Sequence, residues 1–249
     1  MPKIWFTADT HFGHGNIVKY CNRPFLKKLD IEALESNGGE WHDGIWKGEF
    51  ASRHRISREA VEEMNNTIID NINKYVAEED TLWHLGDFAF APRGKYVAHC
   101  EGYRGRIRCQ NVNIVWGNHD EPTCEEPSDS DYHIRHLFNK ARHLVITKFS
   151  GHKNKFFMSH YANAVWDKSH RGAIHLYGHS HTTAESGLDK HFPGRRSIDV
   201  GVDNAFRLLG EYRPFSLDEI LRVVGNKPGH VLDHHTPRRV DSPDESTYT

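Results

Sequence analysis

Residues 4–16 read IWFTADTHFGHGN, an apolar run followed at once by polar side chains and glycines. The apolar run at 4–8 predicts a short buried strand, and the glycines after it predict a loop. Asp9 and His11 lie two positions apart, so both side chains point to the same side if the strand geometry continues. We therefore expect a carboxylate and an imidazole to meet at the carboxyl end of this strand.

The same layout occurs twice more in the first half of the chain. Gly86 precedes Asp87, and Gly117 precedes Asn118, each time directly or shortly after an apolar run. The predicted elements here are strands at 4–8, 81–85 and 112–116 and helices at 58–78 and 95–103. Strands that alternate with helices predict an α/β fold with a largely parallel sheet, whose carboxyl edge gathers polar groups.

The second half is richer in predicted strands, and histidines follow two of them. We expect strands at 144–149, 156–159, 174–177 and 197–202, and a capping-box pattern at Ser216 predicts a last helix that ends near 224. His160 follows one strand, and Gly178 opens the Gly-His-Ser-His run after another. Residues 28–57 show no clear period and predict a long excursion, either functional or partly folded. One domain is expected over 1–225, followed by a polar tail over 226–249.

The composition is that of a globular chain without a strong overall electric field. The 249 residues include 32 Lys and Arg against 34 Asp and Glu, and the formal charge of −2 leaves only local patches to attract nucleic acid or membranes. No apolar run is long enough for a membrane span or a signal-peptide core, which predicts a cytoplasmic protein without membrane partners. The four cysteines lack C-x-x-C spacing and are expected to be reduced structural thiols. The 20 histidines are scattered, and scattered imidazoles can build a metal site without cysteine.

Candidate metal donors follow the predicted strands in both halves. They are Asp9, His11, Asp87, Asn118, His160, His179 and His181. The two carboxylate oxygens of Asp87 can bridge two cations. Oxygen and nitrogen donors without thiolate suit Mn, Fe, Zn, Co or Ni, and the donor types alone do not choose among them. A single Asp-x-His or Gly-Asp is a common accident, but their joint occurrence after apolar strands predicts a metal site.

In this order, the blocks Asp-x-His, Gly-Asp, Gly-Asn-His-Asp, His160 and Gly-His-x-His resemble the calcineurin-like metallophosphoesterase superfamily. The opening residues 6–17 are similar to the start of its small bacterial and phage phosphoesterases, and the resemblance covers residues 4 to about 205. It implies an α/β fold of two facing mixed β-sheets flanked by helices, a four-layer αββα sandwich. The excursion and the tail are longer than in the compact members, which leaves the size of the substrate open.

The resemblance also implies two divalent metal ions, with Mn as the first choice and Fe, Zn, Ni or Co as alternatives. One ion would be held by Asp9, His11 and His181, the other by Asn118, His160 and His179, and Asp87 would be shared. The reaction we expect is hydrolysis of a phosphate ester by in-line attack of a hydroxide that bridges the ions. Because mono- and diesters share this chemistry, the ligand set does not separate a phosphatase from a phosphodiesterase.

Two residues beside the ligands are candidates for proton transfer. His119 follows Asn118 and is expected to face the cleft, as general acid toward the leaving oxygen or as a stabiliser of transition-state charge. Asp120 is expected to hydrogen-bond the His119 imidazole and to fix its orientation. The alternative is that His119 is an ordinary loop histidine.

The sequence says less about the substrate. His14 and Asn16 are candidates to touch a phosphate oxygen or to structure the loop, and Arg53, His54 and Arg55 either favour a phosphate-rich substrate or form a solvated face. The acidic segment 121–131 opposes a polyanion, so a small, nucleotide-like phosphate ester is expected and long nucleic acid is not. The alternatives are a nuclease for single-stranded nucleic acid and an inactive relative that serves as a protein-binding scaffold.

Overall fold

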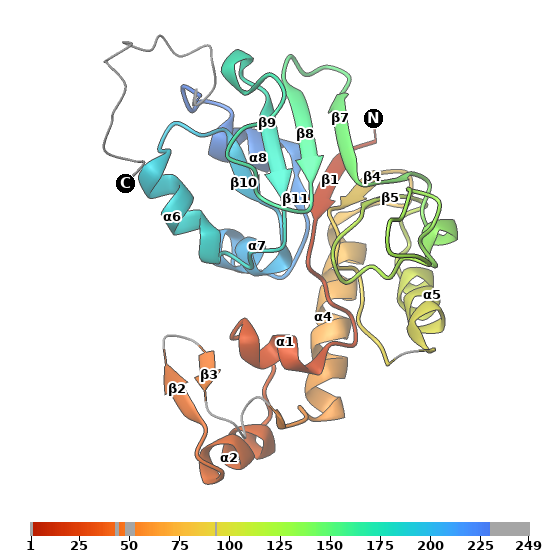
Figure 1. Ribbon diagram of the computed structural model, residues 1–249, viewed down its shortest axis with the longest axis vertical. Helices are drawn as coiled ribbons and strands as arrows, with labels where there is room; N and C mark the ends of the chain where they lie inside the picture. Colours follow the sequence, from red (N-terminus) through yellow and green to blue (C-terminus); the bar gives the residue numbers. More distant parts are fainter. Residues whose placement is uncertain (1, 43–44, 48–52, 93, 230–249) are drawn as a thin grey trace, which may run out of the picture.

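Two mixed β-sheets face each other in the computed structural model, which describes residues 2–42, 45–47, 53–92 and 94–229 (Figure 1). The strand order in the first sheet is β11-β1-β4-β5-β6. Its strands are β1 (Ile4–Thr7), β4 (Thr81–His84), β5 (Asn111–Val115), β6 (Ala141–Arg142) and β11 (Phe215–Ser216). Only β11 pairs antiparallel to its neighbour, so β1, β4 and β5 end at the same edge.

The second sheet has the order β10-β9-β8-β7. Its strands are β7 (Leu144–Lys148), β8 (Lys155–Ser159), β9 (Ile174–Tyr177) and β10 (Ser197–Asp199). Here β8, β9 and β10 are parallel, and β7 is antiparallel to β8. Because β8 and β9 run in the same direction, the residues that follow them lie at one edge as well.

The apolar strands of the first sheet are buried on both faces. In β1, Trp5 packs into the core on the outer face, while Phe6 joins the core between the sheets. Met158 and Leu176 enter that inner core from β8 and β9. This double burial explains why the strands read as continuous apolar runs instead of alternating ones.

Helices cover both outer faces and close the ends of the sandwich. They are α1 (Gly15–Tyr20), α2 (Lys28–Ser36), α4 (Arg58–Tyr75), α5 (Tyr96–Arg106), α6 (Thr183–His191), α7 (Val202–Leu209) and α8 (Leu217–Val224), with short 3-10 turns η1 (Arg135–Leu137) and η2 (Ser169–Arg171). Apolar side chains of α4 and α5, among them Ile68 and Cys100, pack on the outer face of the first sheet. Glu185 of α6 contacts Tyr177 of β9 on the second sheet. The predicted α/β sandwich of two facing mixed sheets with flanking helices is confirmed.

Part of the excursion predicted at 28–57 forms regular elements. It contains α2 and a hairpin of β2 (Glu40–His42) and β3 (Ile45–Lys47), which project from the body below α1 in Figure 1. Leu34 is buried, and Asp30 accepts hydrogen bonds from Ser57 and from the backbone of Lys27. The sequence pattern missed these elements because a short amphipathic helix leaves little periodic signal.

Other departures from the predicted elements are local. The strand expected at 197–202 ends at Asp199, because Gly201 is the N-cap of α7. Helices α1, α6 and α7 were not predicted at all. Of the tail predicted at 226–249, the structure describes only 226–229, and the rest of that prediction lies outside the described residues. Within the described part of the chain, no helix combines the length and the apolar character that crossing a membrane requires.

Candidate metal centre

The predicted donors gather where the carboxyl edges of the two sheets meet. Asp9, Asp87 and Asn118 follow β1, β4 and β5, while His160 and His179 follow β8 and β9. The two sets are in contact, since Asn118 Oδ1 lies 3.1 Å from His160 Nε2 and 2.9 Å from His179 Nδ1. The structure therefore brings together donors far apart in sequence, such as Asp9 and His179, which are 170 residues apart.

The sequence-based interpretation of Asp9 and His11 assumed that the strand geometry continues at this edge. The backbone does not continue it. Strand β1 ends at Thr7, and positive φ angles occur at five predicted ligands: Asp9 55°, His11 47°, Asp87 58°, His179 67° and His181 44°. Only three other described non-glycine residues have positive φ. Such angles cost of order 1–3 kcal/mol each and persist only where surrounding structure holds them, typically at functional sites. The convergence of Asp9 and His11 was predicted correctly, but for the wrong geometric reason.

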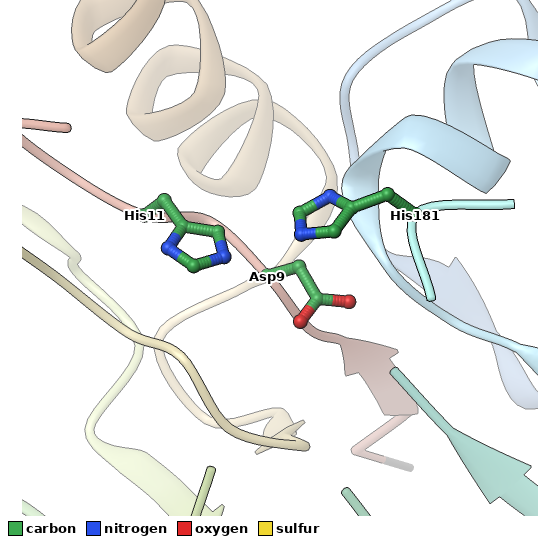
Figure 2. A group of neighbouring side chains, drawn as sticks. All are labelled: Asp9, His11 and His181. Carbon is green, nitrogen blue, oxygen red and sulfur yellow. The ribbon is translucent and has the colours of Figure 1, made fainter. Parts of the chain in front are cut away.

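Asp9, His11 and His181 form the first group of possible ligands. One donor atom from each lies within 4.8 Å of the others, and Figure 2 shows the two rings on either side of Asp9 with ring nitrogens directed toward the space between them. Asp9 is fully buried, and the backbone N–H of His179 donates to both of its carboxylate oxygens, at 3.0 and 2.9 Å. The ring centres of His11 and His181 are 5.1 Å apart.

Asp87, His160 and His179 form the second group, again with donor atoms within 4.8 Å of one another. His160 donates from Nδ1 to the carbonyl of Leu85 at 2.7 Å, so Nε2 is the nitrogen that faces Asp87 Oδ2 at 3.4 Å and Asn118 Oδ1, and it presents a lone pair to them when it carries no proton. A lone pair and two oxygens repel one another unless a cation or a proton lies between them. The arrangement thus fits a metal ion held by these residues.

Asp87 connects the two groups. Its Oδ2 atom is 3.4 Å from His11 Nε2 on one side and 3.4 Å from His160 Nε2 on the other. Its other oxygen accepts a hydrogen bond from the backbone N–H of His119 at 2.8 Å. Because Asp87 is equally distant from a histidine of each group, it lies where a ligand shared by two cations would have to lie.

The chemistry of His11 and Asp9 also fits a cation. Both ring nitrogens of His11 are buried and have no hydrogen-bond partner among the described residues, and burial together with neighbouring cationic groups lowers the pKa of His11 well below the usual range. Burial raises the pKa of Asp9 to about 7 despite the opposing effect of His181. Burial lowers the pKa of His181, but its contact with Asp203 outweighs this and raises it to about 11. Neutral imidazole beside a buried carboxylate is the pairing that divalent transition metals bind.

Two of the glycines in the motifs are required by close approach. A Cβ atom on Gly117 would lie 2.3 Å from Asp87 Oδ1, and one on Gly178 would lie 2.7 Å from Asp9 Oδ2. Real Cβ contacts are not that short, so any other residue would displace the carboxylate. The glycine before each ligand therefore makes room for the ligand of another strand.

A second layer that the sequence did not indicate supports the first group. Asp203 of α7 accepts a hydrogen bond from His181 Nδ1 at 2.6 Å and a bidentate one from Arg23 at 2.8 Å to each oxygen. Arg23 also donates to the backbone carbonyls of Asp9 at 2.7 Å and Thr10 at 3.2 Å. By fixing Nδ1 of His181, Asp203 leaves Nε2 for a metal ion, the usual arrangement around metal-binding histidines.

Asp120 has a different role from the predicted one. Its buried carboxylate accepts hydrogen bonds from the backbone N–H groups of Asp87, Phe88 and Gly117 at 2.8–3.0 Å. No hydrogen bond to the His119 ring is present among the described contacts. Asp120 thus holds the loop after β4 against the loop after β5, because three converging amides bind a carboxylate better than one partly exposed imidazole does.

His119 lies beside the first group without belonging to it. Its ring centre is 5.3 Å from that of His11 and 6.3 Å from that of His14. The ring of His14 stacks on Phe90 at 4.2 Å, and Phe90 is 41% exposed. On the side of the second group, Tyr161 is 50% exposed, with its ring 4.5 Å from that of His179. The sequence reasoning missed both aromatic residues, since neither belongs to a motif.

The remaining predicted substrate residues lie in or next to the part of the chain that projects from the body, which contains α2, β2 and β3. Asn16 is in the first turn of α1 and is partly exposed. His54 contacts Asp30 of α2 at 3.6 Å, and its carbonyl accepts a hydrogen bond from Lys19 of α1. Arg53 and Arg55 are exposed. The contacts of His54 thus tie α1 to α2, and a role of these residues in substrate binding stays a prediction.

Comparisons with known proteins support the fold and leave the activity open. No family model matches the chain. An uncharacterized protein of Methanocaldococcus jannaschii is 28% identical over 90% of this chain and 92% of its own length, and the gene 66 protein of Mycobacterium phage L5 is 25% identical over 91% and 96%. The solved structure of a protein of unknown function from Aquifex aeolicus matches with a TM-score of 0.52 and 19% identity, covering 90% of this chain and all of that one. This likeness shows a shared fold alone.

A solved phosphoesterase from E. coli, Yfce, matches more weakly. Its TM-score is 0.28 at 15% identity, over 72% of this chain and 70% of that one. A similarity at this level carries no argument, so the chemistry has to be inferred from the residues of the site.

Proposed function

We propose that the protein is a phosphoric ester hydrolase that depends on two divalent metal ions, with Mn as the first choice. The observation that carries the proposal is the position of Asp87 between two groups of donors, with Oδ2 at 3.4 Å from a histidine of each. Asp9, His11 and His181 would hold one ion and Asn118, His160 and His179 the other. Two bound divalent cations would supply Lewis-acid stabilisation of the phosphoryl oxygens and would make water a stronger acid near neutral pH.

The chain itself contributes orientation and a proton donor. Backbone amides from His179 and His119 hold Asp9 and Asp87 in place, so little reorganisation is needed when charge develops. His119 is the general acid we propose for the leaving oxygen, because its ring lies next to His11 while its backbone contacts Asp87.

The proposed substrate is a small phosphate ester whose leaving group carries a planar aromatic ring. A nucleotide, with its base, is an example. Two exposed aromatic rings lie at opposite sides of the site, Phe90 beside His14 and Tyr161 beside His179. Exposed rings next to a phosphate-binding site are suited to stack on a base, and such stacking is worth about 1–3 kcal/mol. The acidic segment 121–131 favours a small substrate over a long strand.

The test is to strip the protein with a chelator, reload it separately with Mn, Ni, Zn or Fe, and follow hydrolysis of p-nitrophenyl phosphate and of its bis-ester. We expect two metal equivalents per chain and hydrolysis with at least one metal. Asp87→Asn should lose the second equivalent and the activity. Asp70→Asn, the same change at an exposed position on α4, serves as the control. Stoichiometric metal binding without hydrolysis of either ester would refute the proposal.

A further inference from the structure

A cavity of about 540 Å³ lies at the amino ends of β8 and β9, at the opposite end of these strands from the metal centre. Cationic side chains dominate its lining, and no acidic residue takes part: the cations are Lys153, Lys155, Lys168, Arg171 and Arg196. We call it the basic cavity. Its volume falls within the roughly 300–1,000 Å³ typical of small-molecule sites.

The basic cavity is separate from the candidate metal centre. Lys155 is the first residue of β8, and His160 follows the last. A strand rises about 3.3 Å per residue, so the five residues of β8 place the two sites about 15 Å apart. A small ligand in the cavity would therefore not reach the proposed metal ions.

Within the part of the chain that the structure describes, no ion pair compensates the positive charge of the basic cavity. Among the described residues, none of its five cations forms an ion pair, although the chain has 34 acidic residues to supply partners. Neighbouring cations just outside it are paired: Arg195 contacts Glu185 at 3.1 Å, and Lys227 contacts Asp189 at 3.2 Å. Like charges gathered without a partner repel one another, and an anionic ligand would remove that repulsion.

Part of the lining is fixed in place. Arg196 is half-buried and donates from Nε to the carbonyl of Lys227 and from a terminal nitrogen to the carbonyl of Gly172 at 3.4 Å. Gly172 has φ +82°, a conformation that other residues rarely adopt, and a Cβ atom there would lie 2.7 Å from that guanidinium. Lys168 has a left-handed backbone, φ 61°, just before η2. These contacts hold a cationic side chain against the cavity wall before any ligand arrives.

We propose that the basic cavity binds a small ligand with several phosphate groups, a tripolyphosphate or the triphosphate of a nucleotide. Several adjacent cations match a chain of phosphates better than a single carboxylate, and guanidinium groups bind phosphate in bidentate fashion. The net charge of −2 and the acidic segment 121–131 disfavour a long nucleic acid. The proposal is independent of the reaction at the metal centre.

The test is calorimetric titration of the full chain, after chelator treatment, with inorganic tripolyphosphate and with ATP at low and high salt. We expect one ligand per chain, bound at least about tenfold more weakly by the double variant Lys155→Ala/Arg171→Ala. The control variant Lys190→Ala/Arg222→Ala removes the same charge from exposed positions elsewhere and should bind as the original chain does. Asp87→Asn should also bind normally, because the metal centre is not involved.

Three results would overturn the proposal: no binding at millimolar ligand and low salt, equal losses in the cavity and control variants, or loss of binding in Asp87→Asn. Tripolyphosphate and ATP of equal affinity would identify the phosphate chain as the recognised group, and tighter binding of ATP would add the nucleoside. Tighter binding of a single-stranded oligonucleotide through Lys155 and Arg171 would contradict a small ligand. Thermal melting of both double variants checks that they fold.

Discussion

Replacing Arg23 by methionine should destabilise the fold strongly. Arg23 is 1% exposed, and its guanidinium joins Asp203 to the backbone carbonyls of Asp9 and Thr10. Methionine keeps the apolar stem but removes all of these hydrogen bonds. The buried Asp203 carboxylate would then keep only His181 as a charged partner.

The expected loss follows from the contacts. Removing one partner of a buried ion pair costs about 3–5 kcal/mol, because the other charge stays buried and uncompensated. The bidentate geometry at 2.8 Å to each oxygen of Asp203 places Arg23 well within that range, and two backbone carbonyls lose a donor as well. A domain of this size loses about 2–4 °C of Tm per kcal/mol, so about 10 °C is expected.

The assay is urea and thermal unfolding of Arg23→Met beside Arg58→Met. Arg58 forms an exposed pair with Glu62 on α4, and its replacement should leave the midpoint unchanged. In the double variant Arg23→Met/Asp203→Leu no carboxylate is left unpaired, so at least half of the lost stability should return. Metal affinity of the double variant should nevertheless be about 10–100-fold lower than that of the original chain, because His181 no longer has an acceptor for Nδ1. Equal unfolding midpoints for Arg23→Met and Arg58→Met would refute this account, as would normal metal affinity in the double variant.

Three further predictions concern catalysis, substrate and pH. His119→Ala should keep both metal equivalents, measured by elemental analysis, while kcat falls at least about 10²-fold, the usual scale for a proton-transfer residue; unchanged turnover would remove it from the mechanism. Phe90→Ala should lower kcat/KM for aryl or nucleotide esters by about 5-fold or more and leave methyl phosphate unaffected, and equal losses for both would argue against stacking. Burial raises the pKa of Glu219, but its contacts with Arg213 and Ser216 outweigh this and lower it to about 2. This stabilisation is complete above the ordinary pKa near 4.5 and is lost as pH falls toward 2. Glu219→Gln should therefore be less stable than the original chain at pH 7 and equally stable at pH 2. A stability difference that does not change with pH would contradict this prediction.

The sequence predicted the strands and the meeting of the donors because both depend on local signals. Apolar runs buried on two faces give parallel strands, and the ligands stand just after these runs at the carboxyl edge: Asp9 directly, and Asp87 and His179 after a glycine. The conformation of that edge was not predictable. Alternation along a strand is a property of regular backbone, whereas Asp9 and His11 take left-handed angles that only their neighbours can impose.

The sequence also did not predict the contacts between distant segments. Arg23 and Asp203 are 180 residues apart, and neither stands in a motif, so nothing in the sequence pairs them. Asp120 does stand in a motif, but adjacency to His119 suggested the wrong partner. Its carboxylate reaches three backbone amides that come together only when the loops after β4 and β5 are folded.

Backbone strain at the left-handed ligand positions creates a conflict between heat resistance and the retention of metal ions. Glycine adopts positive φ without the steric cost that aspartate or histidine carries, so a library screened only for survival of heating should enrich it at positions 9, 11, 87, 179 and 181. The most robust survivors would be those that had given up the donors. Laboratory evolution of a tougher variant would therefore need a second selection, for retained cations, applied in every round.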